Sequence, residues 1–212
     1  MVIVGMSVVT DTFNKIPPYG LVHDWLGRET VNRLLRFAQS NEQRFDDSTV
    51  THEEGERVDC TRRISRKLQI FGGLRSELSG KVEDLLPIML NRLGIKPFIP
   101  EKIEVELAAH GDRAFFKRHT DTVTHIGHEG RGRIISSVYY FYSLPKSFSG
   151  GVLRLHSLAA SGEKGTFVDI EPDYDKLVFF PSFFPHEVLP VKCASGEFLH
   201  SRFAINFWVH GN

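Results

Sequence analysis

The sequence lacks several features that would place it in a class at once. Its 26 lysine and arginine residues balance its 26 aspartate and glutamate residues, so no global field draws it to nucleic acid or to an anionic membrane. Its apolar start has no cationic segment or cleavage signal, and no apolar run reaches membrane-spanning length. Its two cysteines, Cys60 and Cys193, are far apart and form no C-x-x-C pair. We therefore expect free thiols, a cytoplasmic protein, and neither nucleic acid nor membrane as a partner.

The first hundred residues carry a helical pattern. At 212 residues the chain is long enough for one domain, and apolar side chains recur at helical spacing over residues 31–38 and 74–85. Pro87 cannot continue the hydrogen-bonded ladder, so we predict a break there and a short final helix ended by Gly94. Residues 44–67, between the helices, are polar and charged. A solvated loop or edge hairpin is the simpler interpretation, and a mobile flap over a site is the functional one.

From Ile103 onward the apolar period changes from about 3.6 to 2. Short apolar runs follow one another, separated by glycine, proline, aspartate and serine, with no helical pattern between them. About eight such strands predict a closed or sandwiched antiparallel sheet such as a jelly roll. The fold class is therefore mainly β with N-terminal helices, and no linker or repeat divides the chain.

Two His-x-Asp pairs raise the question of a metal site, because non-heme iron oxygenases use two imidazoles and one carboxylate. One pair is His110 and Asp112, where the glycine between them and the arginine after them indicate a turn with ordinary polar loop residues. The other, His119 and Asp121, follows a strand-like segment that can aim its ligands from a rigid edge. We therefore predict the second pair as the ligands.

A third ligand has to come from a distant strand, and His186 follows an aromatic segment in a suitable setting. An isolated histidine there is more often a structural residue. Sixteen positions later Arg202 begins an alternating strand, on one face with Ala204, Asn206 and Trp208. An arginine among aromatic side chains needs an anion, and the distal carboxylate of 2-oxoglutarate matches its planar fork.

Taken together, these segments resemble the prolyl hydroxylase family of 2-oxoglutarate- and iron-dependent oxygenases, over about residues 104–210. No single segment is specific, but their order along the chain is that of the family. The matching segments are residues 116–121, 137–141, 149–154, 169–172, 177–180, 186–188 and 202–208.

The resemblance implies a site and a fold. It implies that His119, Asp121 and His186 are the catalytic iron ligands, that Arg202 binds the distal carboxylate, and that Tyr140 donates its hydroxyl to the same carboxylate. The cofactors would be Fe(II), 2-oxoglutarate as co-substrate and O2, with ascorbate as a candidate addition. The usual fold is a double-stranded β-helix, a cupin-like jelly roll. Residues 1–212 would then be one domain, with about 1–100 as helical support and substrate flap and about 101–212 as the catalytic jelly roll.

Two departures from the family concern the co-substrate contacts, and the loose match of the N-terminal half, which usually shapes the substrate mouth, leaves the substrate open. Ala109 stands near the position of a co-substrate-facing tyrosine of some relatives, and the connection from Val191 to Arg202 is longer than in the oxygen sensors. We expect hydroxylation of an unactivated carbon in a peptidyl or free amino-acid side chain, with proline as one candidate. The alternatives are a small-molecule or natural-product hydroxylase and a non-catalytic cupin-like binding module. His125 and His128 are expected to be solvated, with substrate contact as the minor alternative.

Overall fold

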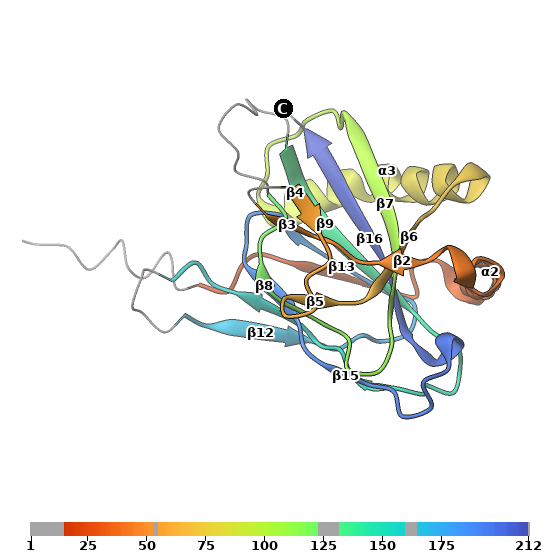
Figure 1. The fold of residues 1–212 in the computed structure, drawn as a ribbon. Helices are drawn as coiled ribbons and strands as arrows, with labels where there is room; N and C mark the ends of the chain where they lie inside the picture. Colours follow the sequence, from red (N-terminus) through yellow and green to blue (C-terminus); the bar gives the residue numbers. More distant parts are fainter. Residues whose placement is uncertain (1–14, 53–54, 123–131, 160–164, 212) are drawn as a thin grey trace, which may run out of the picture.

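Two antiparallel sheets form the structure, a computed structural model that describes residues 15–52, 55–122, 132–159 and 165–211 (Figure 1). The larger sheet has the order β1-β13-β9-β16-β7-β6-β2. In that order its strands span Gly20–His23, Lys176–Pro181, Gly132–Phe141, Arg202–Gly211, Lys102–His110, Arg66–Gln69 and Asp46–Asp47.

The smaller sheet has the order β12-β11-β14-β8-β5. In that order its strands span Phe167–Ile170, Leu153–His156, His186–Val188, Phe115–His119 and Arg63–Ile64. Two short pairs complete the strands: β10 (Ser149–Gly150) with β15 (Val191–Lys192), and β3 (Val50–His52) with β4 (Gly55–Arg57).

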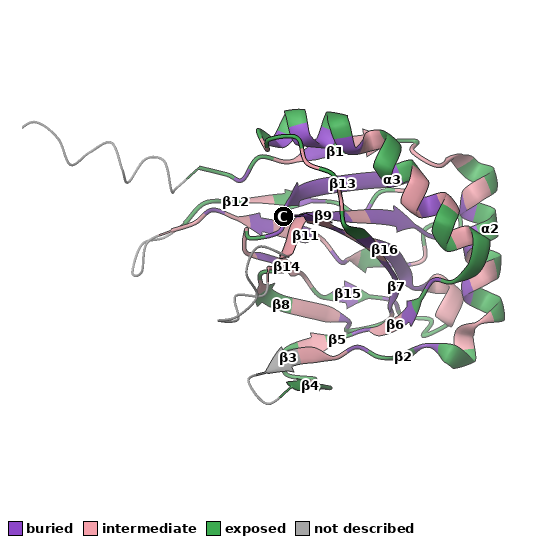
Figure 2. Ribbon diagram, turned by 90° about the horizontal axis from the view of Figure 1, so that it is seen from above, coloured by how far each residue is buried: buried purple, intermediate pink, exposed green. Residues whose placement is uncertain are grey.

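The helices cover the face of the larger sheet that is turned away from β8 and β14 (Figure 2). They are α2 (Gly27–Ser40) and α3 (Gly72–Leu93), and two short 3-10 turns are η1 (Glu42–Arg44) and η2 (Phe198–His200). Apolar side chains of both helices form one buried cluster with that face of the sheet. Within the described residues, neither helix is long and apolar enough to cross a membrane.

Strand β16 shows how alternation separates the core from the site. Phe203, Ile205 and Phe207 belong to the cluster under the helices, whereas Ala204 belongs to a second cluster between the two sheets. Because alternate side chains of a strand point to opposite faces, Arg202 and its even-numbered neighbours also face the smaller sheet. The predicted shared face of this strand is therefore confirmed, since Arg202, Asn206 and Trp208 line one cavity.

The predicted break at Pro87 is wrong, because α3 continues through it to Leu93. The proline ring removes one hydrogen bond to the carbonyl of Glu83, but both residues lie on the exposed side of the helix, where water can satisfy that carbonyl. The predicted end is confirmed. Gly94 follows in the left-handed conformation, with φ of 67°, and donates its backbone N–H to the last turn.

The first hundred residues contribute more strands than their helical pattern predicts. Strand β1 pairs with β13 at one edge of the larger sheet, and β6 and β2 extend its other edge. Strand β5 pairs with β8 at the edge of the smaller sheet. The polar segment 44–67 therefore closes one side of both sheets, a role that its charged sequence does not reveal because edge strands tolerate charge.

Candidate active site

Two histidines on neighbouring strands of the smaller sheet meet an aspartate that follows the end of one of these strands. His119 ends β8, His186 begins β14, and the two residues are directly paired across the ladder. The backbone N–H of Asp121 donates to the carbonyl of Ser182 at 3.0 Å, which holds the carboxylate beside them. One ligand atom of each of the three residues lies within 4.8 Å of the other two. The structure therefore brings together the three residues that the sequence predicts as ligands.

Both imidazoles are held with the same nitrogen free. Nδ1–H of His119 donates to the carbonyl of Lys117 at 2.8 Å, and Nδ1–H of His186 donates to the carbonyl of Phe184 at 3.0 Å. Their Nε2 atoms lie 3.7 Å and 3.4 Å from the carboxylate oxygens of Asp121. A histidine that donates through one nitrogen is fixed in the tautomer that offers the other as a metal ligand.

The protonation states of these groups also suit a metal. Burial and the neighbouring His186 lower the pKa of His119 to about 3, so the ring is neutral at pH 7. Burial alone would raise the pKa of Asp121, but the two histidines and a hydroxyl outweigh it and hold that pKa low. The hydroxyl belongs to Ser136, which donates to the carboxylate at 2.7 Å. A neutral imidazole and an ionised carboxylate are the forms that bind metal.

A buried cation with unpaired donors lies at the other end of the same cavity. Arg202 is only 1% exposed, and its Nε and NH2 groups have no hydrogen-bond partner among the described residues. The hydroxyl of Tyr140 is likewise unpaired there, and the guanidinium carbon lies 4.8 Å from the centre of the Tyr140 ring. Burial raises the pKa of Tyr140 to about 12, so its hydroxyl keeps its proton as a donor. Buried donors of this kind require an anionic acceptor.

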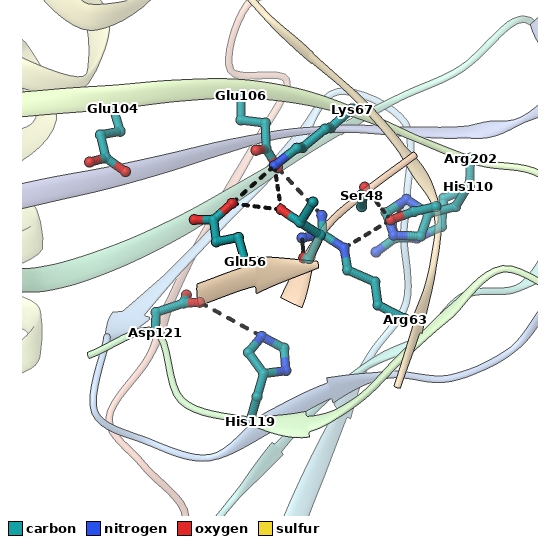
Figure 3. Close-up of polar contacts among 12 residues, drawn as sticks. Ser48, Glu56, Arg63, Lys67, Glu104, Glu106, His110, His119, Asp121 and Arg202 are labelled. Carbon is teal, nitrogen blue, oxygen red and sulfur yellow. Dashed lines mark hydrogen bonds and ion pairs between the residues drawn. The ribbon is translucent and has the colours of Figure 1, made fainter. Parts of the chain in front are cut away.

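The prediction that His110 is an ordinary loop residue is wrong. The turn predicted after it exists at residues 111–114, but His110 itself ends β7, is buried, and stands opposite Arg202 in the ladder. Its Nδ1 accepts a hydrogen bond from NH1 of Arg202 at 3.3 Å (Figure 3). Burial and the charge of Arg202 lower the pKa of His110 well below its usual value, which keeps the ring neutral. Strand alternation from Glu104 was the signal that could have placed His110 on this face.

The cavity between these two ends is small and has aromatic walls. It measures about 50 Å³, and its lining includes the triad, Arg202, Phe116, Trp208 and Arg63. Phe116 stacks on the ring of His119 with 3.5 Å between centroids. Arg63 also contacts Phe116, because its guanidinium carbon lies 4.7 Å from the centre of the Phe116 ring. The same arginine lines a second cavity of about 360 Å³. No local pattern identifies Arg63 as a site residue, because it comes from β5, far along the chain from the His-x-Asp motif.

Residues 105–210 match the profile of the 2OG-Fe(II) oxygenase superfamily, which covers half of the chain. The chain belongs to this superfamily. Its members use Fe(II), 2-oxoglutarate and O2, and the donor set fits both groups: two oriented imidazoles and a carboxylate for the metal, and the unpaired donors of Arg202 for the carboxylate. Ala109, which the sequence placed near a family tyrosine, lies instead on the helix-side face.

This 2OG-Fe(II) oxygenase has relatives among hydroxylases. It is 32% identical over 195 residues to an uncharacterized PKHD-type hydroxylase of Synechocystis, covering 90% of this chain and 62% of the relative. It is 26% identical over 213 residues to human Egl nine homolog 1, covering 96% of this chain and 43% of the relative. The chain thus spans only part of the length of these curated relatives.

Solved structures share the fold. A Pseudomonas putida prolyl-4-hydroxylase has a TM-score of 0.66 at 24% identity, covering 96% of this chain and 97% of that one. A Trichoplax adhaerens prolyl hydroxylase, solved with a peptide of hypoxia inducible factor, has a TM-score of 0.67 at 23% identity, covering 96% and 87%. The antiparallel sheets therefore fit a jelly roll. His125 and His128 lie outside the described residues.

Proposed function

We propose that this oxygenase is a hydroxylase of the prolyl hydroxylase type, with Fe(II) held by His119, Asp121 and His186. The observation that carries the proposal is the pair of imidazoles whose Nδ1 atoms are tied to main-chain carbonyls, so that both Nε2 atoms turn to one carboxylate. Two imidazoles and a carboxylate leave positions on the metal for 2-oxoglutarate and O2.

The buried cation selects the co-substrate. The unpaired Nε and NH2 of Arg202 form one edge of the guanidinium fork, which fits both oxygens of the distal carboxylate of 2-oxoglutarate. Tyr140 adds a hydroxyl donor beside it. When bound, iron, 2-oxoglutarate and O2 supply the oxidising chemistry that hydroxylates an unactivated carbon and leaves succinate and CO2. Phe116 and Trp208 keep water from the cavity where the substrate carbon is held.

The proposed organisation is one domain over residues 1–212, with a double-stranded β-helix from about residue 101 as the catalytic, cupin-like part. The helices and edge strands of about residues 1–100 support it. Residues 44–67 are the proposed substrate flap. The proposed substrate is an amino-acid side chain, free or in a peptide. This rests on the relatives, one of which is a prolyl-4-hydroxylase and another of which was solved with a peptide.

Anaerobic spectroscopy tests the metal and the co-substrate together. Addition of Fe(II) and 2-oxoglutarate should give the weak visible charge-transfer band of a 2-oxo acid chelated to iron. His119→Ala and His186→Ala should each abolish it, because each removes one metal ligand. The matched control is His156→Ala on β11, whose ring pairs with Glu187 outside the cavity lining. A band that persists in both ligand variants contradicts the assignment.

A further inference from the structure

Two cations, one from β5 and one from β6, meet beside the proposed active site. Arg63 of β5 and Lys67 of β6 both contact Thr49: NH1 of Arg63 lies 3.5 Å from the Thr49 carbonyl, and Nζ of Lys67 donates to the Thr49 hydroxyl at 2.9 Å. Two carboxylates share the cluster, Glu106 from β7 and Glu56 from β4. Figure 3 shows these side chains converging on one point, above His119 and Asp121 in that view.

Both cations are only loosely paired. NH2 of Arg63 lies 3.4 Å from Glu106, and Nζ of Lys67 lies 4.0 Å from Glu56, whereas charge-assisted contacts are usually about 2.7 to 2.9 Å long. Elsewhere in the chain Arg154 makes two such contacts with Asp169, at 2.7 and 2.8 Å. The side chains of Arg63 and Glu106 are only 10% and 8% exposed, so the pair is largely shielded from bulk water. A buried ion pair with poor geometry is weak support for stability.

Arg63 lines the triad's cavity, and Lys67 lies on the same side of the larger sheet without lining that cavity. Lys67 pairs with Ala108, which pairs with Ala204, a member of the cluster between the two sheets. Lys67 therefore sits on the strand face that is turned toward the smaller sheet, next to two alanines that take little room. Arg63 lines the triad's cavity and stacks over Phe116.

The local charge points to one anionic group. Glu106 is buried and fixed on a central strand, but the side chain of Glu56 is 63% exposed on a short hairpin and can turn away into water. Two cations and the fixed carboxylate then leave one positive charge. A single carboxylate brought by a ligand would cancel it. Nε of Arg63 donates to the Ser65 hydroxyl at 2.9 Å, so the ligand would be bound by the remaining N–H groups of NH1 and NH2, whose present contacts are long.

We propose that Arg63 and Lys67 bind a carboxylate of the substrate, so that the substrate is a free amino acid or a similar small acid rather than an uncharged residue within a peptide. The inference rests on the proposed function, because it places this carboxylate beside the proposed metal site. An acidic side chain of a peptide carries the same group, so the experiment must distinguish these two sources.

The test measures binding without turnover. Protein loaded with Mn(II) and 2-oxoglutarate is titrated by calorimetry with the free L-amino acids, their primary amides, and end-capped peptides with an internal proline or an internal glutamate. At least one free acid should bind, and its amide should bind at least tenfold more weakly. Tighter binding of the glutamate peptide than of every free acid would assign the carboxylate to a peptide side chain and overturn the free-acid proposal.

Variants then assign the effect to the two cations. In Lys67→Met and Arg63→Lys the free acid should lose at least tenfold in affinity, while the amide changes less than twofold. Lys67→Arg should restore most of the loss, because it restores the charge. Lys192→Met is the matched control, since it removes an exposed lysine from the separate strand pair of β10 and β15. Arg63→Met with Glu106→Leu removes the buried pair together, which guards against misfolding from one unpaired charge.

Three results would overturn the inference: no free acid binds, the capped proline peptide binds best, or the ratio of acid to amide affinity is unchanged in both single variants. Failure of the proposed function looks different. In that case 2-oxoglutarate itself does not bind to the metal-loaded protein, and the charge-transfer band is absent before any substrate is added.

Discussion

At the scale of single residues, the guanidinium of Arg202 presents two different edges. NH1 is bound to His110, and the edge formed by Nε and NH2 is unpaired among the described residues. Arg202→Lys keeps the charge but loses this edge, so the affinity for 2-oxoglutarate should fall by about 1.5 to 3 kcal/mol. Titration at fixed metal concentration measures the loss. Metal affinity should barely change, and unchanged 2-oxoglutarate binding would remove Arg202 from the site.

The acceptor on His110 should matter for the same affinity. Because Nδ1 accepts from NH1 of Arg202, it fixes which edge of the guanidinium meets the ligand. His110→Leu should weaken 2-oxoglutarate binding about tenfold, since it leaves NH1 without its acceptor, and His110→Asn should retain much of it through the amide oxygen. The measurement is the KM for 2-oxoglutarate against kcat. Equal losses in both variants would show that His110 only fills space.

The residues that sequence reasoning found and missed differ in a physical way. His119 and Asp121 are two positions apart, so one strand end carries both and the motif is visible locally. The glycine and the charged residues after His110 predict a turn, and the turn exists, but His110 itself is the last residue of the strand before it. Arg63 and Lys67 reach the site because β5 pairs with β8 and β6 pairs with β7, and no local pattern encodes that pairing.

At the scale of elements, α2 takes its N-terminal cap from a distant loop. The two carboxylate oxygens of Asp175 accept from the backbone N–H groups of Leu26 and Gly27 at 2.9 and 2.8 Å, and one also accepts from the hydroxyl of Tyr139 at 2.7 Å. Asp175 is buried, with φ of 52°. One side chain thus fastens the helix to the sheet that carries the site.

Asp175→Ala should lower the free energy of unfolding by about 3 to 5 kcal/mol, because it leaves the buried Tyr139 hydroxyl and two partly buried backbone N–H groups unpaired. Asp175→Asn should lose less, since asparagine keeps an acceptor oxygen and tolerates a positive φ. Urea unfolding measures both. The exposed neighbour Glu171→Ala is the control and should change stability by no more than about 0.5 kcal/mol. A loss for Asp175→Ala as small as that of the control would refute this account.

The element predictions are confirmed where the apolar period is long, and they miss features that depend on exposure or on a contact distant in the sequence. The strand at residues 202–211 was visible because ten residues alternate between two buried faces. A proline inside a helical pattern predicts a break, and only the exposure of Pro87 makes it tolerable within α3. Asp175 lies 149 and 148 positions from the two residues whose N–H groups it caps, beyond any sequence window.

At the scale of the whole molecule, the site exists because two sheets enclose polar groups that neither could bury alone. The larger sheet supplies Arg202, His110 and Tyr140, and β8 and β14 of the smaller sheet supply His119 and His186. Helices α2 and α3 stay on the far face and leave the space between the sheets to the site. The buried imidazoles of His110 and His119 therefore affect the stability of the fold as well as its chemistry.

Acid should destabilise the metal-free protein before any carboxylate titrates. Burial, followed by the charge of Arg202, lowers the folded-state pKa of His110 well below 6.5, and burial with His186 lowers that of His119 to about 3. Below pH 6.5 these two histidines thus bind protons in the unfolded chain but not in the folded chain, so the free energy of unfolding rises with pH. Asp121 has its pKa lowered from 3.8, so it contributes only below that value.

From pH 7 to pH 5.5 the two histidines should together lower the free energy of unfolding by about 2 to 3 kcal/mol. Urea unfolding with a chelator present measures this slope. His110→Asn should remove about half of it, because asparagine takes up no proton in either state, and the exposed His23→Asn should leave it unchanged. A slope that stays the same in His110→Asn would mean that the buried ring at the end of β7 accepts a proton in the folded protein, and its role as the neutral acceptor for Arg202 would fall with it.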